Sequence, residues 1–251
     1  MRSYPAGAEA KEDTLSKLSI LNSIRKLPPI YGATMSMLDL YSWTKSRRKG
    51  SYSQHGEDAF VANFFAARAN GFYLDIGASH PFRLSNTYSL YRSGWNGVTV
   101  EPIPRLGKLH RRWRPRDTMI PVAVGPARGT LEFFEMTPSV LSTLDRSVAE
   151  EYVAEGRAVL CRTYVIDVLP INEIIERVSA IAPIDFLSID VEGLDADVLA
   201  GMDSSRFRPG LICIEANSME IRGKMRILFE KAGYEIVKEI ECNLMAIPAS
   251  S

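Results

Sequence analysis

From residue 51 onward, short runs rich in β-branched and aromatic residues alternate with segments of helical pattern. Since a helix between two strands carries the chain back across a sheet, such strands are predicted to be parallel. The predicted strands are GFYLDIGA (71–78), WNGVTVEP (95–102), TMIPVAVG (118–125), IDFLSIDVEG (184–193) and RPGLICIEAN (208–217), with helices such as IPRLGKLHRRW (103–113) and INEIIERVSA (171–180) between them.

The chain ends in two further predicted strands, YEIVKEI (234–240) and CNLMAIP (242–248). Only Glu241 separates them, which is too short for a crossover, so they must form an antiparallel hairpin. The predicted fold is therefore α/β and Rossmann-like, with a mainly parallel seven-stranded sheet, an antiparallel C-terminal hairpin and helices on both faces. We read GTLEFFEM (129–136) as a hairpin-like piece and the rest of 134–170 as loop with one helical stretch.

Residues 1–50 carry few strand signals and are predicted to be a helical extension to a domain that spans 51–251. One helix is predicted over 15–27, before Pro28. A second apolar stretch, 35–50, ends in a basic cluster. A basic amphipathic helix can lie on a membrane, but we interpret this one as a lid or a dimer arm with solvated charges. A homo-oligomer is compatible with that interpretation.

Charge, hydropathy and cysteine content argue against several kinds of partner and location. The chain has 30 Lys and Arg residues and 30 Asp and Glu residues, so no global charge directs it to nucleic acid. It contains no apolar run of transmembrane length, and its start lacks the apolar core of a secretory signal. Its three cysteines fit reduced thiols, and we expect a cytoplasmic protein.

Two acidic residues lie at the ends of consecutive predicted strands, where open parallel sheets bind ligands. Asp75 ends the first strand and is followed by a tight turn at Gly77-Ala78 that lets a ligand approach the backbone closely. Glu101 ends the second strand, where a carboxylate accepts both hydroxyls of a ribose. The pair predicts a site for a cofactor that contains a nucleoside.

The turn after the first strand distinguishes between such cofactors. A nicotinamide cofactor needs the pattern G-x-G-x-x-G, so that its pyrophosphate reaches a helix N-terminus. Here the turn (77–82) reads GASHPF, with a single glycine and a proline. S-adenosylmethionine has no phosphates and does not need the other glycines, so the turn favours methyl transfer over hydride transfer.

Several blocks in order resemble the FkbM family of methyltransferases. They are SYSQHGED (51–58), residues 71–102, RPRD (114–117), PVAVG (121–125), IDFLSIDVEG (184–193) and RPGLICIE (208–215). The resemblance covers roughly 51–245 and implies a class I S-adenosylmethionine-dependent enzyme. It further implies O-methylation of a sugar or macrolide hydroxyl, and hence a small-molecule or glycan acceptor.

The same resemblance implies roles for individual residues. Asp75 and Gly77 would lie beside the methionine part of the cofactor, and Glu101 would hold the ribose. Ala123, at the end of the third predicted strand, would lie near the adenine. Glu57 belongs to the opening motif of the family and would reach the amino group of the cofactor.

Candidates for the acid–base chemistry follow the cofactor turn and the fourth predicted strand. Asp190 and Glu192 point to the same face if the segment is extended, so both could meet one substrate, share a proton or bind one metal. His80 is a second candidate for the general base, or it fixes its loop through a hydrogen bond. Ser85 and Asn86 open the next helix, whose N-terminus would favour the carboxylate of the cofactor.

A divalent metal is a third means of activating a hydroxyl group. Glu215 and Asn217 end the fifth predicted strand, beside the strand that carries Asp190. Carboxylate and amide oxygens of this kind bind Mg²⁺. Asp190, Glu215 and Asn217 are therefore the predicted metal ligands, with a purely structural use as the alternative.

Two other functions compete with methyl transfer. A nicotinamide-dependent oxidoreductase or epimerase of a nucleotide sugar would need the missing glycines. A binding protein that has kept the fold and lost activity would not need Asp75, Glu101 and Asp190, which are all present. The sequence does not identify the acceptor, because the expected pocket loops carry no motif.

Overall fold

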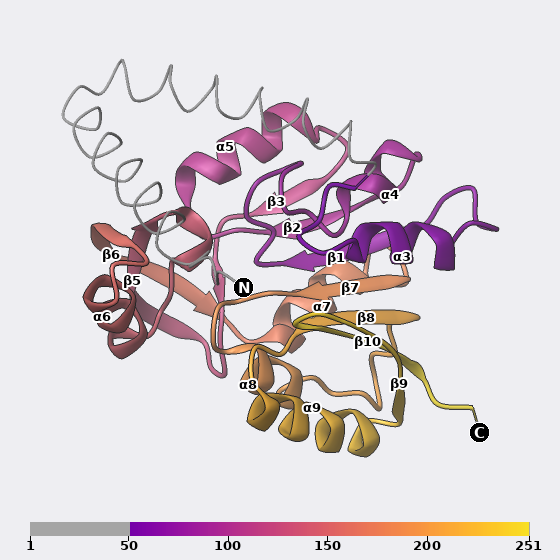
Figure 1. Ribbon diagram of the computed structural model, residues 1–251. Coiled ribbons are helices and arrows are strands. Elements are labelled where there is room, and N and C mark those ends of the chain that lie inside the picture. The colour runs from indigo at the N-terminus through magenta and orange to yellow at the C-terminus, as the bar shows by residue number, and fades with distance from the viewer. Residues whose placement is uncertain (1–50, 251) are drawn as a thin grey trace, which may run out of the picture.

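A computed structural model describes residues 51–250 of the chain. Its main sheet has seven strands in the order β3-β2-β1-β7-β8-β10-β9 (Figure 1). The first five of these are parallel, and β10 runs antiparallel to both β8 and β9. The strands are β1 (Phe72–Ile76), β2 (Asn96–Val100), β3 (Thr118–Ile120), β7 (Phe186–Ile189), β8 (Leu211–Glu215), β9 (Tyr234–Ile240) and β10 (Asn243–Pro248).

This sheet confirms the predicted fold. Register pairs such as Asp75 with Thr99 and Leu187 with Ile212 keep the parallel strand ends level, so the loops that follow them meet at one edge. The predicted hairpin is also present, closed by a turn in which Glu241 has φ 49°. The expected N-terminal helices fall on residues 1–50, which lie outside the described residues.

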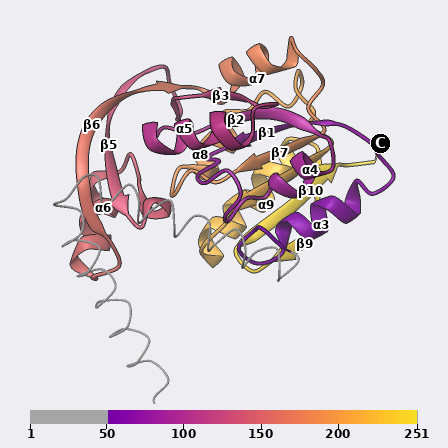
Figure 2. The same cartoon turned by 90° about the horizontal axis from the view of Figure 1, so that it is seen from above.

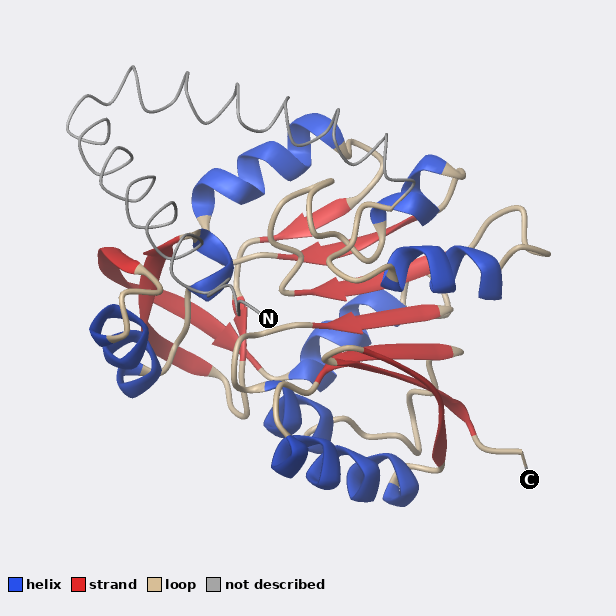
Figure 3. Cartoon of the chain, in the orientation of Figure 1, coloured by secondary structure: helices blue, strands red, loops and turns tan. Residues whose placement is uncertain are grey.

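Helices cover both faces of the main sheet (Figure 3). One apolar cluster contains β1, β2, β7, β8 and β10 side chains together with α7 (Ile171–Ser179), α8 (Asp195–Ala200) and α9 (Met219–Lys231). A second cluster, on the other face, contains residues of α3 (Glu57–Phe64) and α4 (Tyr88–Arg92) around Trp95. Strands β1, β2, β7 and β8 lie between the two clusters and are buried almost throughout, as expected for a parallel sheet covered on both sides.

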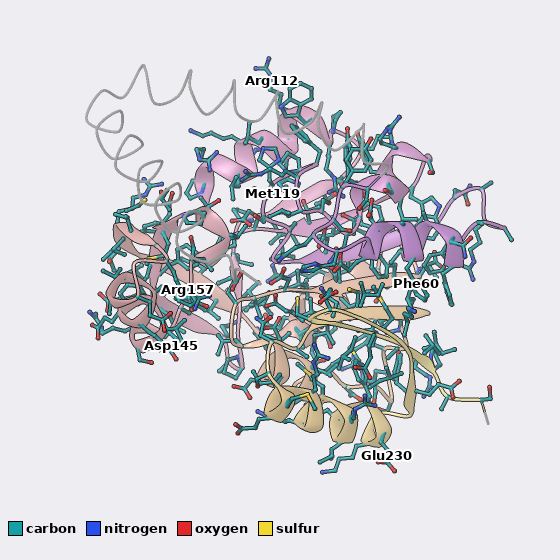
Figure 4. All side chains as sticks on the ribbon, in the orientation of Figure 1. Phe60, Arg112, Met119, Asp145, Arg157 and Glu230 are labelled. Atoms are coloured by element: carbon teal, nitrogen blue, oxygen red, sulfur yellow. The ribbon has the colours of Figure 1, made fainter. Side chains whose placement is uncertain are left out.

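Helix α5 (Pro104–Trp113) packs beside β3 at one end of the sheet. The side chain of Met119, labelled in Figure 4, fills the space above Gly107 of this helix. Within the described residues, no helix combines the length and the apolar character that crossing a membrane requires.

A second, smaller sheet corrects the prediction for residues 118–170. The expected single strand over 118–125 is split: β3 joins the main sheet, and β4 (Ala123–Val124) joins the second sheet. The expected loop contains an eleven-residue strand, β6 (Val159–Leu169), which pairs with β4 and with β5 (Gly129–Thr137). Figure 2 shows β5 and β6 as a curved ribbon that leaves the main sheet, with α6 (Arg146–Ala154) beside it.

Candidate functional site

A cavity of about 580 Å³ lies at the carboxyl ends of the parallel strands, between the main sheet and the second sheet. The main sheet contributes the turns after β1, β2, β7 and β8, the second sheet contributes Ala123 and Phe133, and the segment 139–144 between β5 and α6 also lines the cavity. Polar groups therefore line one side of the cavity, where the strands end, and apolar groups line much of the other. Volume and lining are typical of a site for a cofactor and a small substrate.

The turn after β1 is held tightly against the neighbouring strands. The N–H groups of Gly77 and Ala78 donate to the Val100 carbonyl, at 3.0 and 3.1 Å. Gly77 has φ 78°, and a Cβ there would lie 1.7 Å from the Asp190 carbonyl oxygen. Only glycine fits this position, for both reasons. Gly77 lines the cavity, whereas Ala78 is buried and is not among the lining residues.

Glu101 lines the cavity directly after β2. Its Oε1 accepts the N–H of Ile103 at 2.6 Å, so the carboxyl group is fixed in place. Burial raises the pKa of Glu101 to about 8, an effect only partly offset by hydrogen bonds from the backbone at Ile103 and Ser79. Ala123 of β4 lines the same cavity, together with Val122 and Val124. An oxygen acceptor next to an apolar wall suits a ribose that carries a flat base.

Asp75 does not line the cavity. It is buried at the end of β1 and accepts the Thr87 hydroxyl at 2.5 Å. Burial raises the pKa of Asp75, while the charge of Arg114 acts in the opposite direction. The carboxyl group therefore faces a buried network, and any effect of Asp75 on the cofactor passes through the loop that follows it.

Of the two predicted residues at the start of the next helix, only Asn86 lines the cavity. Its Nδ2 donates to the Ser188 hydroxyl of β7 at 3.2 Å. Ser85 is buried, and its hydroxyl accepts the N–H of Tyr88. The helix, α4, begins only at Tyr88 and spans five residues.

Glu57 lines the cavity from the start of α3. Its carboxyl group accepts the N–H of His55 and the Asn243 side-chain amide, both at 2.8 Å. Asn243 begins β10 and was not recognised from the sequence, because it lies in a stretch that reads only as an ordinary strand. It orients the carboxyl group of Glu57 in the cavity.

Three carboxyl groups meet on the polar side of the cavity. Asp190, Glu192 and Glu215 each place an oxygen within 4.8 Å of the others. Burial, and after it the charge of neighbouring carboxylates, raises the pKa of all three, to about 8 for Glu192 and about 7 for Glu215. Within the described residues, Oδ1 of Asp190 is buried and has no hydrogen-bond partner.

These three residues, Asp190, Glu192 and Glu215, form the acidic group of the cavity, and the backbone brings them together in a different way from the predicted one. Glu192 has φ 52°, so the chain turns after β7, and the reasoning from an extended segment was wrong although the two carboxyl groups do meet. Asn217, a predicted metal ligand, is exposed and donates its amide to Glu215 at 2.7 Å. Glu192 is a third carboxyl group beside Asp190 and Glu215, while Asn217 also lines the cavity and stays a predicted ligand.

His80 is buried and is not among the lining residues of the cavity. Its Nδ1 lies 3.4 Å from the N–H of Phe82, and its ring packs edge-on against the Phe82 ring, with the centroids 4.4 Å apart. These contacts fit the alternative of a residue that fixes its loop. A role for His80 as general base stays a prediction.

The second sheet and α6 supply lining residues that the sequence did not reveal. Tyr152 of α6 and Arg157, which follows it, both line the cavity. The guanidinium carbon of Arg157 lies 4.4 Å from the centroid of the Tyr152 ring (Arg157 is labelled in Figure 4). Arg157 is the one cationic side chain in the lining, against five carboxyl groups, within the part of the chain that the structure describes.

Comparisons with known proteins find one family and several similar structures. A family model described as a methyltransferase FkbM domain matches residues 75–236. No curated protein matches the chain. One similar solved structure is a 1,6-didemethyltoxoflavin-N1-methyltransferase of Burkholderia thailandensis with bound S-adenosylhomocysteine (TM-score 0.41, 11% identity, covering 89% of this chain and 91% of that one). Another is a TehB-like SAM-dependent methyltransferase of Corynebacterium glutamicum (TM-score 0.42, 12% identity, covering 87% and 100%).

Proposed function

The chain belongs to the FkbM family of S-adenosylmethionine-dependent methyltransferases, and from this premise we propose that it methylates oxygen. The proposed acceptor is a hydroxyl group of a sugar, a glycoconjugate or a polyketide-type metabolite. The observation that carries the proposal is the group of three carboxyl side chains, Asp190, Glu192 and Glu215, on the polar side of the cavity.

The residues of the cavity fit the cofactor. Gly77 lines the cavity and carries no side chain, so a ligand can approach its backbone closely there. We assign the ribose hydroxyls to Glu101, the adenine to the wall at Ala123, and the amino acid part to Glu57 and Asn86. S-adenosylmethionine supplies a methyl group that is already activated on a sulfonium, so the protein must align the acceptor and exclude water.

The three carboxyl groups fit the other requirement of the reaction. An alcohol has a high pKa, and a base that removes its proton as the new bond forms assists the transfer. Burial and mutual repulsion raise the pKa of all three carboxyl groups, and those of Glu192 and Glu215 to about 8 and about 7, so the group holds a proton more strongly than an exposed carboxylate does. We assign the role of the base to Asp190, because it lines the cavity directly after β7 and its carboxyl group lies within 4.8 Å of oxygens of Glu192 and Glu215.

A Mg²⁺ ion is an alternative occupant of the same three carboxyl groups. Three carboxylate oxygens within 4.8 Å of one another suit a hard cation that keeps some of its water. Asp190, Glu192 and Glu215 would hold the ion, which lowers the pKa of a hydroxyl group bound to it. In that case Glu192 is the third carboxylate ligand.

Two measurements test the proposed function. Calorimetry should detect binding of S-adenosylhomocysteine and no binding of NAD. A screen of neutral sugars, glycosides and hydroxylated macrocycles with labelled S-adenosylmethionine should give products whose new methyl group carries the carbon chemical shift of a methoxy group. A methylamine shift in every product would contradict O-methylation, and binding of NAD alone would favour the oxidoreductase.

A further inference from the structure

We propose that Arg114 is a positioning residue for the cofactor site, a buried clamp that holds residues 81–87 in the conformation that forms one wall of the cavity. Arg114 follows α5 and lies outside the cavity lining. The inference rests on the proposed placement of the cofactor at Gly77 and Asn86.

The wall that the clamp would hold is conformationally unfavourable. Ser79 has φ 47° and Leu84 has φ 55°, and both are non-glycine residues in the left-handed region. Such conformations persist only where the surroundings hold them, and they are common at ligand sites. Both residues line the cavity, together with Asn86. This wall therefore needs contacts from outside the loop.

Arg114 supplies those contacts from a completely buried position, with none of its side chain exposed. Its Nη1 lies 3.3 Å from the Pro81 carbonyl oxygen and 3.4 Å from the Ser85 hydroxyl. Its Nη2 donates to the Thr87 hydroxyl at 2.9 Å. The three acceptors flank Leu84 and Asn86, the residues that line the cavity.

The other side of the guanidinium is anchored to the sheet. Nε donates to Asp117 at 2.6 Å, and Nη2 also donates to the Tyr73 hydroxyl of β1 at 2.9 Å. Asp117 in turn accepts the Tyr73 hydroxyl and the N–H of Gly97 in β2. The planar fork of an arginine reaches the sheet and the loop at the same time, which a lysine does not.

A relay connects the clamp to the end of β1. Thr87 accepts from Arg114 and donates its own hydroxyl proton to Asp75 at 2.5 Å. Asp75 lies two residues before Gly77, so the relay fixes the cofactor turn at its start as well as at its end. The charge of Arg114 also stabilises the carboxylate of Asp75 against its burial.

Two matched substitutions distinguish two roles for Arg114: a residue that holds the cofactor wall, and a residue that only forms a structural ion pair. Thr87→Val and Tyr73→Phe each remove one buried hydroxyl that accepts from Arg114 and donates to a carboxylate, Asp75 or Asp117. Both should lower the melting temperature. Only Thr87→Val should also weaken S-adenosylhomocysteine binding, by about tenfold, while Tyr73→Phe stays within about twofold of the wild type.

Amide hydrogen exchange gives a readout that does not need the ligand. In Thr87→Val, amide exchange at residues 79–87 should accelerate more than exchange in the strands. In Tyr73→Phe, exchange in the loop and exchange in the strands should change by the same factor. Equal effects of the two variants on binding and on exchange would overturn the proposal. Arg114→Lys is a third variant and should behave like Thr87→Val, because it keeps the charge and loses the planar fork. If the wild type binds no S-adenosylhomocysteine, the cofactor placement fails, and exchange alone decides whether the clamp exists.

Discussion

A Cβ atom on Gly77 would lie 1.7 Å from the carbonyl oxygen of Asp190. Beside this contact, the N–H of Asp190 donates to the Ile76 carbonyl at 3.0 Å. The turn assigned to the cofactor and the residue assigned to the acceptor are thus held together through backbone. Because methyl transfer depends on the alignment of its two reactants, a shift of either strand end should affect both binding and turnover.

Gly77→Ala should therefore be strongly destabilising. A side chain would add both an unfavourable positive φ and a clash with backbone, so we expect a loss of about 2–4 kcal/mol in the free energy of unfolding. Urea denaturation measures this loss. S-adenosylhomocysteine binding to the fraction that stays folded should also weaken.

The control for this prediction is Gly223→Ala. Gly223 lies in α9 and is exposed, and a Cβ atom added to it would have nothing within 4 Å. Alanine is the better helix former, so this variant should be more stable than the wild type by about 0.5–1 kcal/mol. Equal stability of the two variants would show that the close contact at Gly77 relaxes easily.

The main sheet was predictable because its pattern is regular. Strands β1, β7 and β8 are almost continuous apolar runs, which is the pattern of a strand buried on both faces. The second sheet lacks such a pattern. Strand β6 contains Arg162, Thr163 and Asp167 among its apolar residues, and β4 has only two residues. Pairing between distant segments, which sequence periodicity does not report, creates this sheet.

The candidate site was predictable only in part, for the same reason. Gly77, Glu101 and Asp190 follow predicted strands, so the rule for strand ends located them. Tyr152 and Arg157 reach the cavity only because the second sheet carries α6 there. Asp75 obeys the same rule but is turned into the interior by Thr87, a contact that no spacing reveals.

Glu101→Ala should weaken cofactor binding without a matching loss of stability. Removing the acceptor leaves ribose hydroxyls unpaired, which costs about 1–3 kcal/mol of S-adenosylhomocysteine binding. Glu101→Gln should fall between the wild type and Glu101→Ala, because one amide oxygen remains as acceptor. Calorimetry gives the three dissociation constants. Glu235→Ala, on the exposed side of β9, is the control, and an unchanged constant in Glu101→Ala would remove the ribose from this position.

Stability should depend on pH through the acidic group. The pKa of Glu192 is about 8 and that of Glu215 about 7 in the folded protein, both above the ordinary value of 4.5. The folded state therefore holds protons that the unfolded state releases, and the free energy of unfolding should fall as the pH rises from about 5 to about 8.

Glu192→Gln tests this dependence. The amide cannot ionise, so the variant should be more stable than the wild type at about pH 8 by about 1–3 kcal/mol, with a smaller difference at about pH 5. Glu230→Gln, an exposed change on α9, is the matched control and should leave the pH dependence as it is. Parallel pH profiles for Glu192→Gln and the wild type would show that the acidic group is neutralised by other means.

Asp190→Asn should separate catalysis from cofactor binding. The substitution keeps the shape of the side chain and removes its ability to take a proton, and general bases typically contribute about 10²–10⁴-fold to a rate. We expect turnover to fall by about 10²-fold or more, while the dissociation constant of S-adenosylhomocysteine stays within about twofold.

The same variant distinguishes a carboxylate base from a metal when it is measured with and without EDTA. If Asp190 acts as the base alone, EDTA leaves the wild type active and Glu215→Gln retains more activity than Asp190→Asn. If Mg²⁺ activates the hydroxyl group, EDTA abolishes wild-type activity, added Mg²⁺ restores it, and Glu215→Gln resembles Asp190→Asn, because both carboxylates belong to the same group. Full activity in Asp190→Asn would exclude this residue from both mechanisms. His80 would then be the remaining candidate, and His80→Ala should remove the acidic limb of the pH–rate profile, since only a neutral imidazole accepts a proton.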